Sequence, residues 1–469
     1  MKNNSIPVHS SLLLGQNALP KDPTGEWKVI DPSRSEVRIA KCVYAYSQID
    51  SLVNAAHENQ KAWANKNFQE RHRILIQSIE TFISNRDLII EVAQHELGRS
   101  LEDMKFEFAQ IEKWAQAFEK FTPLEQEPRG VTAVVSSYVS PLLNNTHFVF
   151  LNLLAGNAVV LKPSERAALT VLKWAEYVTK DESIAKVFQV LVGEKEMGRR
   201  LICHDQISTV IFMGSFEVGM RVKQDTLSQP AKEVLLYLGA KNAAILCEDF
   251  PKNAAKTLIQ DCFLSTGQNC RSVSVIFVHE SKFQEFLDEF HQLSKEFKIG
   301  PPLSHAYMGP FIDEAMLDRH LKFVGISERE GGEVLMRGKP LTLAEKGHFA
   351  TPTLAVFQEV TPELMKKSIS LQAEILAPHV SVIRYESYEN MVQVQQQMHY
   401  GLCASIWGAN QERMKQIARD LNVGEVVFNQ SLLEVDLSES FQARKKSGNH
   451  AHHGFKLYEQ LTVLNKKPR

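Results

Sequence analysis

Hydrophobic positions in the first quarter of the chain follow a helical period. Apolar side chains recur three or four residues apart over residues 50–64 and 68–84, and again over 88–118, where Gly98 is a soft interruption. Residues 130–138 read Gly-Val-Thr-Ala-Val-Val-Ser-Ser-Tyr, and this valine-rich run predicts a strand. The chain is therefore expected to open with helices and then to enter a region that contains strands.

From residue 157 onward, short apolar runs alternate with amphipathic segments. Strands are predicted over residues 157–161, 187–192, 209–213, 234–238, 243–246, 273–278, 380–384 and 424–429. Helices are predicted over residues 167–179, 199–204, 216–225, 281–297, 387–398 and 411–421. Such alternation is typical of parallel sheets with helices on both faces. We expect two α/β halves that separate near residues 239–248, and a loop over residues 444–454.

Length and charge exclude several classes of protein. A chain of 469 residues predicts about three domains, or fewer large ones. The 53 basic and 55 acidic side chains nearly cancel, which argues against a nucleic-acid partner. No apolar run reaches the roughly 18 to 20 residues of a membrane span, and no secretory signal is recognisable. The six scattered cysteines show no metal-binding spacing, so we expect reduced thiols, no metal site and a cytoplasmic location.

Three short motifs carry candidate chemistry. Cys270 ends the run Thr-Gly-Gln-Asn-Cys, where a nearby glycine lets the backbone approach a ligand and the thiol could act as a nucleophile. Residues 162–165 read Lys-Pro-Ser-Glu and follow a predicted strand, at the edge where open α/β sheets bind ligands. Residues 214–219 read Gly-Ser-Phe-Glu-Val-Gly and open a helix whose N–H groups could bind a pyrophosphate. Taken singly, each motif also has an explanation that involves no function. The cysteine can be a buried apolar side chain, residues 162–165 the solvated start of a helix, and residues 214–219 an ordinary turn.

The order of these motifs is more informative than any one of them. Together with later blocks, they resemble the aldehyde dehydrogenase superfamily over residues 27–463. The ending Ser447-Gly448-Asn449-His450 and the Lys-Pro-Ser-Glu block are most similar to succinylglutamate semialdehyde dehydrogenases. The later blocks are Leu238-Gly239-Ala240-Lys241-Asn242, Met308-Gly309-Pro310, Pro352-Thr353-Leu354, Glu374-Ile375-Leu376-Ala377-Pro378 and Tyr400-Gly401-Leu402-Cys403-Ala404-Ser405-Ile406.

The resemblance implies an α/β fold of two doubly wound domains with a reduced oligomerisation arm. Residues 20–119 and 142–240 would form a split NAD-binding domain, residues 241–428 a catalytic domain, and residues 120–141 and 429–469 shortened bridging elements. Cys270 would attack an aldehyde, passing through a thiohemiacetal and a thioester while NAD accepts hydride. The implied cofactor-binding residues are Lys162, Ser164, Glu165, Gly193, Gly214, Ser215, Phe216, Glu217, Val218, Gly219, Leu238 and Glu374.

Within that set, Lys162 and Glu165 are expected at the adenosine ribose, where a glutamate would repel a 2′-phosphate and favour NAD over NADP. Gly193, Gly214, Ser215 and Gly219 are expected at the pyrophosphate, and Glu374 at the nicotinamide ribose.

The sequence departs from the family pattern at two catalytic positions. Tyr237 stands where the family has its general-base glutamate, and a phenol is a poor base at neutral pH. Val139, 18 residues before Asn157, stands where the family has the asparagine that stabilises the oxyanion. The short segment between Trp114 and Gly130 leaves little room for a tetramerising hairpin, so we expect a homodimer.

Three interpretations therefore remain open. The chain is an aldehyde dehydrogenase in which another group activates water, an enzyme that passes its thioester to a thiol such as coenzyme A, or a catalytically degenerate homologue that binds NAD or a partner. Arg271 follows the cysteine directly and would favour an anionic aldehyde, such as succinylglutamate semialdehyde, if it faces the substrate. An arginine at the surface or in an interface explains it equally well.

Overall fold

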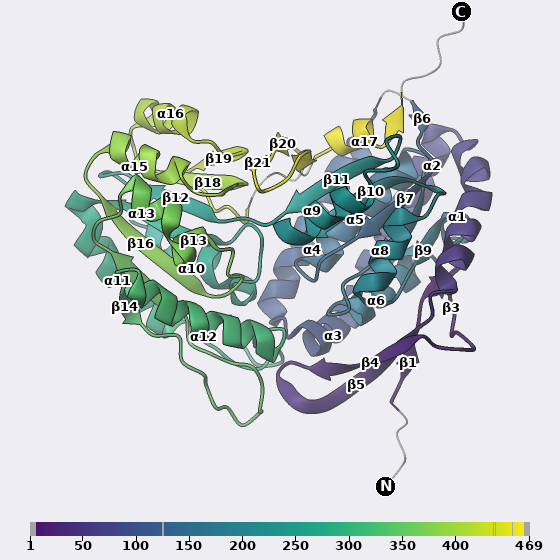
Figure 1. Ribbon diagram of the computed structural model, residues 1–469, viewed down its shortest axis with the longest axis horizontal. Coiled ribbons are helices and arrows are strands. Elements are labelled where there is room, and N and C mark those ends of the chain that lie inside the picture. Colours follow the sequence, from purple (N-terminus) through teal and green to yellow (C-terminus); the bar gives the residue numbers. More distant parts are fainter. Residues whose placement is uncertain (1–5, 124–125, 435, 437, 453, 464–469) are drawn as a thin grey trace, which may run out of the picture.

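The computed structural model describes residues 6–123, 126–434, 436, 438–452 and 454–463. Two seven-stranded sheets stand side by side, each with helices packed around it (Figure 1). The strand order is β11-β10-β7-β8-β9-β2-β3 in the first sheet and β14-β15-β16-β13-β12-β18-β19 in the second. The two α/β halves expected from the alternating pattern are thus present as two sheets.

The first sheet is parallel through its five central strands. Their carboxyl ends therefore meet at one edge, where a ligand is expected in an open α/β sheet. These strands are β11 (Glu233–Leu238), β10 (Ile207–Gly214), β7 (Val131–Val135), β8 (Ala158–Lys162) and β9 (Phe188–Val190). The antiparallel hairpin β2 (Leu12–Leu13) and β3 (Gln16–Asn17) extends the sheet beyond β9.

Helices cover the first sheet. Helix α5 contacts β7 and β8, and α2, α4 and α6 pack against α5, while α1 contacts β7, β8 and β9. The helices of this half are α1 (Gln48–Ala64), α2 (Phe68–Ser84), α3 (Arg86–Leu97), α4 (Leu101–Lys120), α5 (Pro141–Leu154), α6 (Ala168–Val178), α7 (Glu182–Val187), α8 (Lys195–Cys203) and α9 (Phe216–Asp225).

The second sheet is parallel except at one edge, where β14 runs antiparallel to β15. Its strands are β12 (Asn242–Leu246), β13 (Val273–His279), β14 (Glu333–Met336), β15 (Thr353–Phe357), β16 (His379–Tyr385), β18 (Cys403–Trp407) and β19 (Glu425–Phe428). Its helices are α10 (Ala254–Phe263), α11 (Phe283–Glu296), α12 (Glu314–Arg329), α13 (Pro362–Lys367), α14 (Ile369–Gln372), α15 (Tyr388–Gln396) and α16 (Gln411–Asp420).

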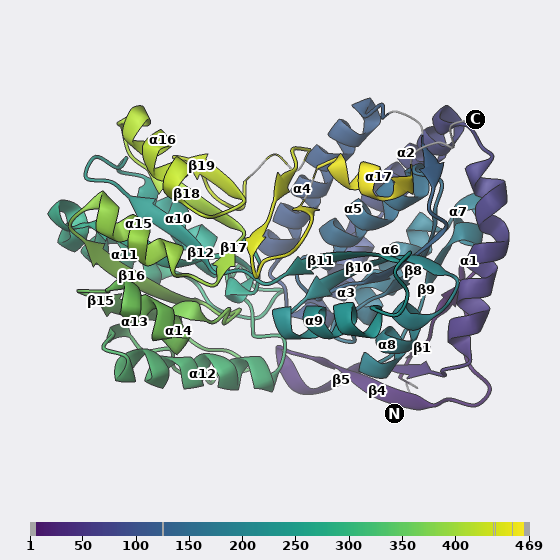
Figure 2. The ribbon, with the colours of Figure 1, turned by 45° about the horizontal axis from the view of Figure 1, so that its top comes forward.

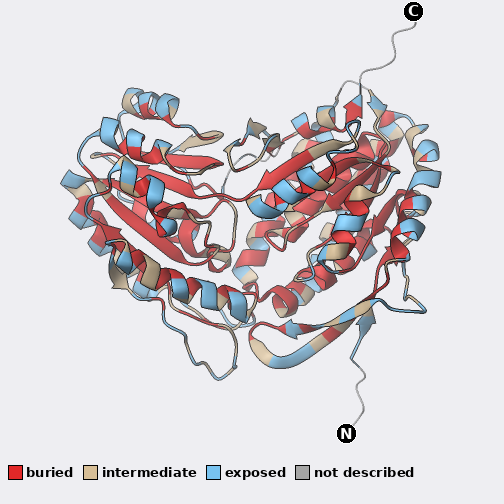
Figure 3. Cartoon of the chain, viewed as in Figure 1, coloured by how far each residue is buried: buried red, intermediate tan, exposed pale blue. Residues whose placement is uncertain are grey.

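Both faces of the second sheet are buried. Ala244 and Leu246 of β12 belong to one apolar cluster, whereas Ala243 and Ile245 belong to another. Because successive side chains of a strand point to opposite faces, the two clusters lie on the two sides of the sheet. This explains why the strand reads as a continuous apolar run, and Figure 3 shows both sheets as buried layers between exposed outer helices.

Smaller elements connect the two ends of the chain to the two α/β halves. Strands β1 (Val8–His9), β4 (Gly25–Asp31) and β5 (Arg34–Tyr44) form a separate sheet beneath the first half. The C-terminal segment crosses from the second half back to the first, where α17 (Lys456–Gln460) contacts α5 (Figure 2). Strand β23 (Thr462–Val463) then pairs with β6 (Glu127–Pro128).

Two expectations from the sequence were wrong. Residues 88–118 form two helices, because Gly98 takes φ +67° and ends α3, and Ser100 with Asp103 forms a capping box that starts α4. Residues 444–454 are not merely a loop. Within them, β21 (Arg444–Lys445) pairs with β17 (Tyr400–Gly401), and β22 (Ala451–His452) pairs with β20 (Phe441–Gln442).

Candidate active site

Cys270 follows a strained turn at the end of α10. Ser265, Thr266 and Gly267 have φ values of +56°, +57° and +62° in succession, a conformation that only glycine adopts without cost. A Cβ at Gly267 would lie 2.3 Å from the Ala377 carbonyl oxygen, so no side chain fits there. Strain of this kind persists where surrounding contacts enforce it, and it clusters at functional sites.

Two side chains from the start of the α4 region hold this turn. Arg99 donates to the carbonyl oxygens of Ser265 at 2.8 Å and of Gln268 at 3.3 Å. The Asp103 carboxylate accepts from the Ser265 N–H at 2.7 Å. The backbone that leads to Cys270 is thereby fixed from both sides by charged, buried groups.

The Cys270 residue borders two cavities. A cavity of about 280 Å³ is also lined by Gly214, Ser215 and Glu374, so it reaches from the start of α9 to the cysteine. A second cavity of about 40 Å³ is lined by Asn269 and by residues of α4 and α5. The larger cavity therefore connects the predicted cofactor residues Gly214, Ser215 and Glu374 with the candidate nucleophile.

Burial raises the pKa of the Cys270 thiol to about 11; the Arg271 guanidinium opposes this shift and the Glu374 carboxylate adds to it. The resting protein therefore holds this group as a neutral thiol at pH 7, and attack on a carbonyl needs the thiolate.

Tyr237 lies at the carboxyl end of β11 and lines the larger cavity. Its hydroxyl donates to the Ala451 carbonyl oxygen at 3.1 Å. Its ring packs against Phe148, with centroids 4.8 Å apart, and against His452 at 4.6 Å. Burial raises the pKa of this phenol further above its ordinary value, so the position contributes no base at neutral pH.

Val139 also lines the larger cavity, immediately before α5. Its side chain is buried and holds no hydrogen-bond donor. Its backbone N–H donates to the Ser137 hydroxyl at 3.2 Å, and its carbonyl accepts from the Asn144 amide at 2.9 Å. The residue at the expected oxyanion position therefore presents only methyl groups to this cavity.

Lys162 and Glu165 lie together at the edge of the first sheet. Lys162 is the last residue of β8 and is 4% exposed, and its Nζ lies 3.4 Å from the Glu165 carboxylate. Burial lowers the pKa of Lys162, and the neighbouring carboxylate acts in the opposite direction. Ser164 lies between them, and its hydroxyl accepts from the Arg166 N–H at 3.3 Å.

The glycine-containing turn lies at the same edge. Gly214 ends β10, and Ser215 caps α9 by accepting from the Val218 N–H at 3.3 Å. Phe216, Glu217, Val218 and Gly219 form the first turn of α9. The Gly219 N–H donates to the Ser215 carbonyl oxygen at 2.9 Å, so the Phe216 and Glu217 N–H groups are the ones left without a partner within the helix. Leu238 ends β11 beside them, and Gly193 follows β9.

Glu374 reaches the larger cavity from the second half of the molecule. Its carboxylate accepts from the Ala240 N–H at 2.8 Å, and burial raises its pKa to about 7. A Cβ at Gly239 would lie 2.1 Å from the same carboxylate, so glycine is required for this approach. Four of the predicted cofactor residues, Gly214, Ser215, Leu238 and Glu374, therefore line one cavity together with Cys270.

Arg271 lines the smaller cavity, but its guanidinium is largely engaged by the protein. It forms a buried ion pair with Glu425, and its Nε donates to the Leu432 carbonyl oxygen at 2.6 Å. One terminal nitrogen, Nη1, is buried with no hydrogen-bond partner among the described residues. Binding of a substrate anion by Arg271 stays a prediction.

Several cavity residues were not predicted from the sequence. Arg166 and Arg319 line the larger cavity, and Ser140, Asn144 and Asn269 line the smaller one. Arg166 follows the Lys-Pro-Ser-Glu block directly, and Asn269 precedes the cysteine, so proximity to a motif could have found both. Arg319 lies in the middle of α12, where no local pattern marks it.

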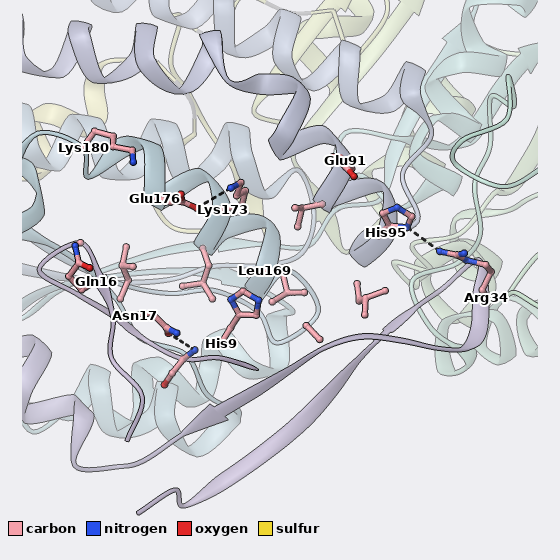
Figure 4. A pocket seen from close by; sticks show the side chains of 17 residues that line it. His9, Gln16, Asn17, Arg34, Glu91, His95, Leu169, Lys173, Glu176 and Lys180 are labelled. Atoms are coloured by element: carbon pink, nitrogen blue, oxygen red, sulfur yellow. Dashed lines mark hydrogen bonds and ion pairs between the residues drawn. The ribbon is translucent and has the colours of Figure 1, made fainter. Parts of the chain in front are cut away.

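Another large cavity lies away from the cysteine. It has a volume of about 770 Å³ and is enclosed by β5, α3, α6 and the N-terminal hairpin (Figure 4). Several of its charges are already paired, because Lys173 contacts Glu176, and Arg34 and His95 both contact Asp31. No cysteine is among its lining residues, so it offers no counterpart to the Cys270 nucleophile.

Two classes of site are absent from the part of the chain that the structure describes. That part holds no cluster of three or more histidine, cysteine, aspartate or glutamate side chains able to bind a metal ion. None of its helices is both long enough and apolar enough to span a membrane.

Comparison with known proteins matches this arrangement. The model of the aldehyde dehydrogenase family matches residues 20–466. The α-ketoglutaric semialdehyde dehydrogenase of Bacillus subtilis is 28% identical over 430 residues, which are 86% of each chain.

Solved structures show the same fold. An aldehyde dehydrogenase from Bartonella henselae superposes with a TM-score of 0.88 at 22% identity, covering 98% of both chains. An indole-3-acetaldehyde dehydrogenase solved with NAD⁺ superposes at 0.89 and 23% identity, covering 99% of this chain and 96% of that one. With the family model matched over nearly the whole sequence and the fold shared, the chain belongs to the aldehyde dehydrogenase family.

Proposed function

We propose that this chain oxidises an aldehyde with NAD, using the Cys270 thiolate as the nucleophile. The observation that carries the proposal is the position of Cys270 between two cavities, one of which is shared with the predicted cofactor residues. The enforced strain at residues 265–267 supports a retained site, because a decayed site has no need to hold backbone in this conformation.

The larger cavity and the neighbouring edge of the first sheet carry residues that fit a dinucleotide. A buried lysine paired with a glutamate suits the hydroxyl groups of a ribose, and the Phe216 and Glu217 N–H groups at the start of α9, which have no partner within the helix, suit a pyrophosphate. Lys162 and Glu165 would hold the adenosine ribose, Gly193, Gly214, Ser215 and Gly219 the pyrophosphate, and Glu374 the nicotinamide ribose. When bound, NAD supplies a hydride acceptor on this side of Cys270.

The protein's own contribution begins when the Cys270 thiol loses its proton to solvent and the thiolate sulfur attacks the aldehyde carbon. A carbon–sulfur bond forms, and the π electrons of the carbonyl move to its oxygen, giving a thiohemiacetal oxyanion. The Cys270 N–H is available to donate to that oxygen. Loss of hydride from the same carbon restores the carbonyl and leaves an acyl thioester on Cys270.

Release of the acyl group distinguishes two candidate activities. A hydrolytic enzyme needs a base near the thioester, and the Tyr237 position offers only a phenol enclosed by Phe148 and His452. The lack of a base at this position favours the second candidate, in which a thiol such as coenzyme A accepts the acyl group. A thiol needs less activation than water, since its pKa lies far closer to neutrality.

The proposed substrate is an anionic semialdehyde, such as succinylglutamate semialdehyde. Two observations support this class. Arg271 lines the smaller cavity, and the Bacillus subtilis relative is named for α-ketoglutaric semialdehyde, which carries one carboxylate. Glu425 neutralises part of the Arg271 charge, so the expected preference for an anion is moderate.

We also propose that the protein works as a cytoplasmic homodimer. Among the described residues between α4 and β7, the only strand is the two-residue β6, and it pairs with β23 of the same chain. These described residues form no long hairpin that could join pairs of dimers. Sedimentation velocity would show a dimer; a tetramer would contradict the proposal.

The test of the proposed function is NADH formation with a panel of aldehydes, with and without coenzyme A. Steady NADH formation without coenzyme A indicates hydrolysis. A single burst that becomes continuous on addition of coenzyme A indicates acyl transfer to the thiol. A protein that binds NAD by calorimetry but forms no NADH and no acyl adduct at Cys270 would be a catalytically degenerate homologue, and both oxidoreductase proposals would fail.

A further inference from the structure

The thiohemiacetal oxyanion lacks a side-chain donor at residue 139. An apolar residue there leaves the Cys270 N–H to stabilise the charge, and loss of one oxyanion donor costs on the order of 100-fold or more in rate. The smaller cavity beside Cys270 carries other polar groups, which come from Ser140, Asn144 and Asn269. The question is which of them holds a donor free to turn toward the reacting carbon.

Asn269 has such a donor. Its Oδ1 accepts from the Arg271 N–H at 2.9 Å, and this bond fixes which end of the amide is oxygen, because a backbone N–H must donate. The Nδ2 group is thereby turned to the cavity, where it makes one long contact of 3.3 Å with the Ser140 hydroxyl. An amide nitrogen carries two hydrogens, and that contact uses one of them.

The Ser140 side chain is free to adjust to this amide. Serine is a preferred N-cap residue, yet the Ser140 hydroxyl makes no capping bond to α5. Glu107 takes that role, since its carboxylate accepts from the N–H groups of Leu142 at 2.9 Å and Leu143 at 3.0 Å. Ser140 itself is held at φ +42°, which places its hydroxyl in the Cys270 cavity at the cost of backbone strain.

Asn144, the competing amide, is more firmly occupied. Its Nδ2 donates to the Val139 carbonyl oxygen at 2.9 Å, a normal bond length. Turning that amide toward a substrate would leave the Val139 carbonyl without this bond. An Asn269 Nδ2–H that leaves the Ser140 hydroxyl for the substrate gives up only a contact of 3.3 Å, and Asn269 immediately precedes the nucleophile.

We propose that the Asn269 amide, together with the Cys270 N–H, forms the oxyanion site of this protein. The proposal rests on the proposed aldehyde chemistry. As the Cys270 sulfur bonds to the aldehyde carbon, the carbonyl oxygen gains the electron pair, and an Asn269 Nδ2–H donates to it. No proton is transferred to the oxygen, and its electron pair re-forms the carbon–oxygen double bond when hydride departs.

The main test compares two reactions of the same thiol. Asn269→Ala should lower kcat/KM for aldehyde oxidation by about 100-fold. Alkylation of Cys270 by iodoacetamide develops no oxyanion, so its rate should change by less than about threefold. Asn269→Asp keeps the acceptor for the Arg271 N–H but has no donor, and it should lose aldehyde oxidation as well. Equal losses in oxidation and alkylation would show that Asn269 merely shapes the turn and would overturn the proposal.

A rescue variant and a variant of the competing Asn144 amide provide two further tests. Val139→Asn in the Asn269→Ala background should recover at least tenfold of the lost rate, because it supplies an amide at residue 139, which lines the larger cavity beside Cys270. A larger loss in Asn144→Ala than in Asn269→Ala would assign the donor to Asn144 and overturn the proposal.

An NAD-free measurement separates this proposal from the proposed function. Propanal should protect Cys270 from iodoacetamide by forming the thiohemiacetal, and Asn269→Ala should raise the half-protecting concentration about tenfold or more. Protection that weakens in the variant upholds the proposal even if no NADH forms. Protection that is unchanged, or absent from the wild type, overturns it.

Discussion

The reactivity of Cys270 should rise steeply with pH in the protein without cofactor. Burial raises the pKa of this thiol to about 11, against an ordinary value of 9.0. At pH 7 the thiolate fraction is then about one in ten thousand, where an unperturbed thiol would have about one in a hundred. Alkylation by iodoacetamide should therefore be about 100-fold slower at pH 7 than for an exposed cysteine, and it should accelerate about tenfold per pH unit through pH 9.5.

Substitution of the neighbouring Glu374 carboxylate tests what determines the Cys270 pKa. Glu374 raises the pKa of Cys270 when it is ionised, and burial raises its own pKa to about 7. Glu374→Gln removes this negative charge, so the Cys270 pKa should fall and alkylation should accelerate by about threefold, which corresponds to half a pKa unit. The acceleration should be larger at pH 8 than at pH 6, because the wild-type carboxyl is already mostly protonated at the lower pH.

The assay is the rate of carbamidomethylation at Cys270, followed by peptide mass spectrometry from pH 6 to 9.5. Cys270→Ser identifies the signal, and Cys203, which is partly exposed, serves as an internal reference on the same molecules. A plateau below about pH 8.5 would mean that the resting cysteine is a thiolate, and it would refute the reasoning from burial. An equal effect of Glu374→Gln at pH 6 and pH 8 would refute the assigned coupling.

Further predictions concern the cofactor site, the turn and stability. Lys162→Ala or Glu165→Ala should weaken NAD binding by about tenfold, as measured by calorimetry. Glu165→Ala should also reduce the ratio of NAD affinity to NADP affinity. Unchanged affinities would show that neither residue contacts the cofactor. Gly267→Ala should slow Cys270 alkylation by more than about tenfold, since its Cβ would meet the Ala377 carbonyl at 2.3 Å; an unaffected rate would show that the turn has room. Burial raises the pKa of Glu96 to about 7 from 4.5, so the folded state holds this proton more tightly than the unfolded chain does. On account of Glu96, the free energy of unfolding should therefore fall by about 3 kcal/mol between pH 4.5 and 7 and stay level above pH 7. Urea titrations of Glu96→Gln should show a free energy of unfolding that depends less on pH over the same range.

Much of the fold could be predicted from periodicity alone. The predicted helices over residues 68–84 and 216–225 coincide with α2 and α9, because an amphipathic stripe and a good N-cap act over a short range of sequence. The antiparallel pair β4 and β5 was not predicted. Strand β4 alternates between exposed and more buried positions, whereas β5 begins with six exposed or partly buried residues and ends in three buried ones, so the two strands share no simple period.

The candidate site was predictable only in part. The end of each parallel strand marks a ligand edge, so Lys162 and Gly214 could be found from sequence. The direction in which a side chain points could not be predicted. The Arg271 guanidinium turns to Glu425, which lies 154 residues further along the chain, and no local pattern encodes that contact. Asn269 was missed for the same reason, since its importance depends on what Val139 fails to provide.

The anchoring of the cysteine turn by Arg99 and Asp103 has an evolutionary consequence. These residues are 166 and 162 positions away from Ser265 in sequence, yet they determine the backbone on which the nucleophile stands. A substitution in this stretch could retune the chemistry while the cysteine motif itself stays intact. Relatives that share the motif but differ at residues 99 and 103 should therefore have diverged in reactivity, and grouping family members by the cysteine block alone would place unlike enzymes together.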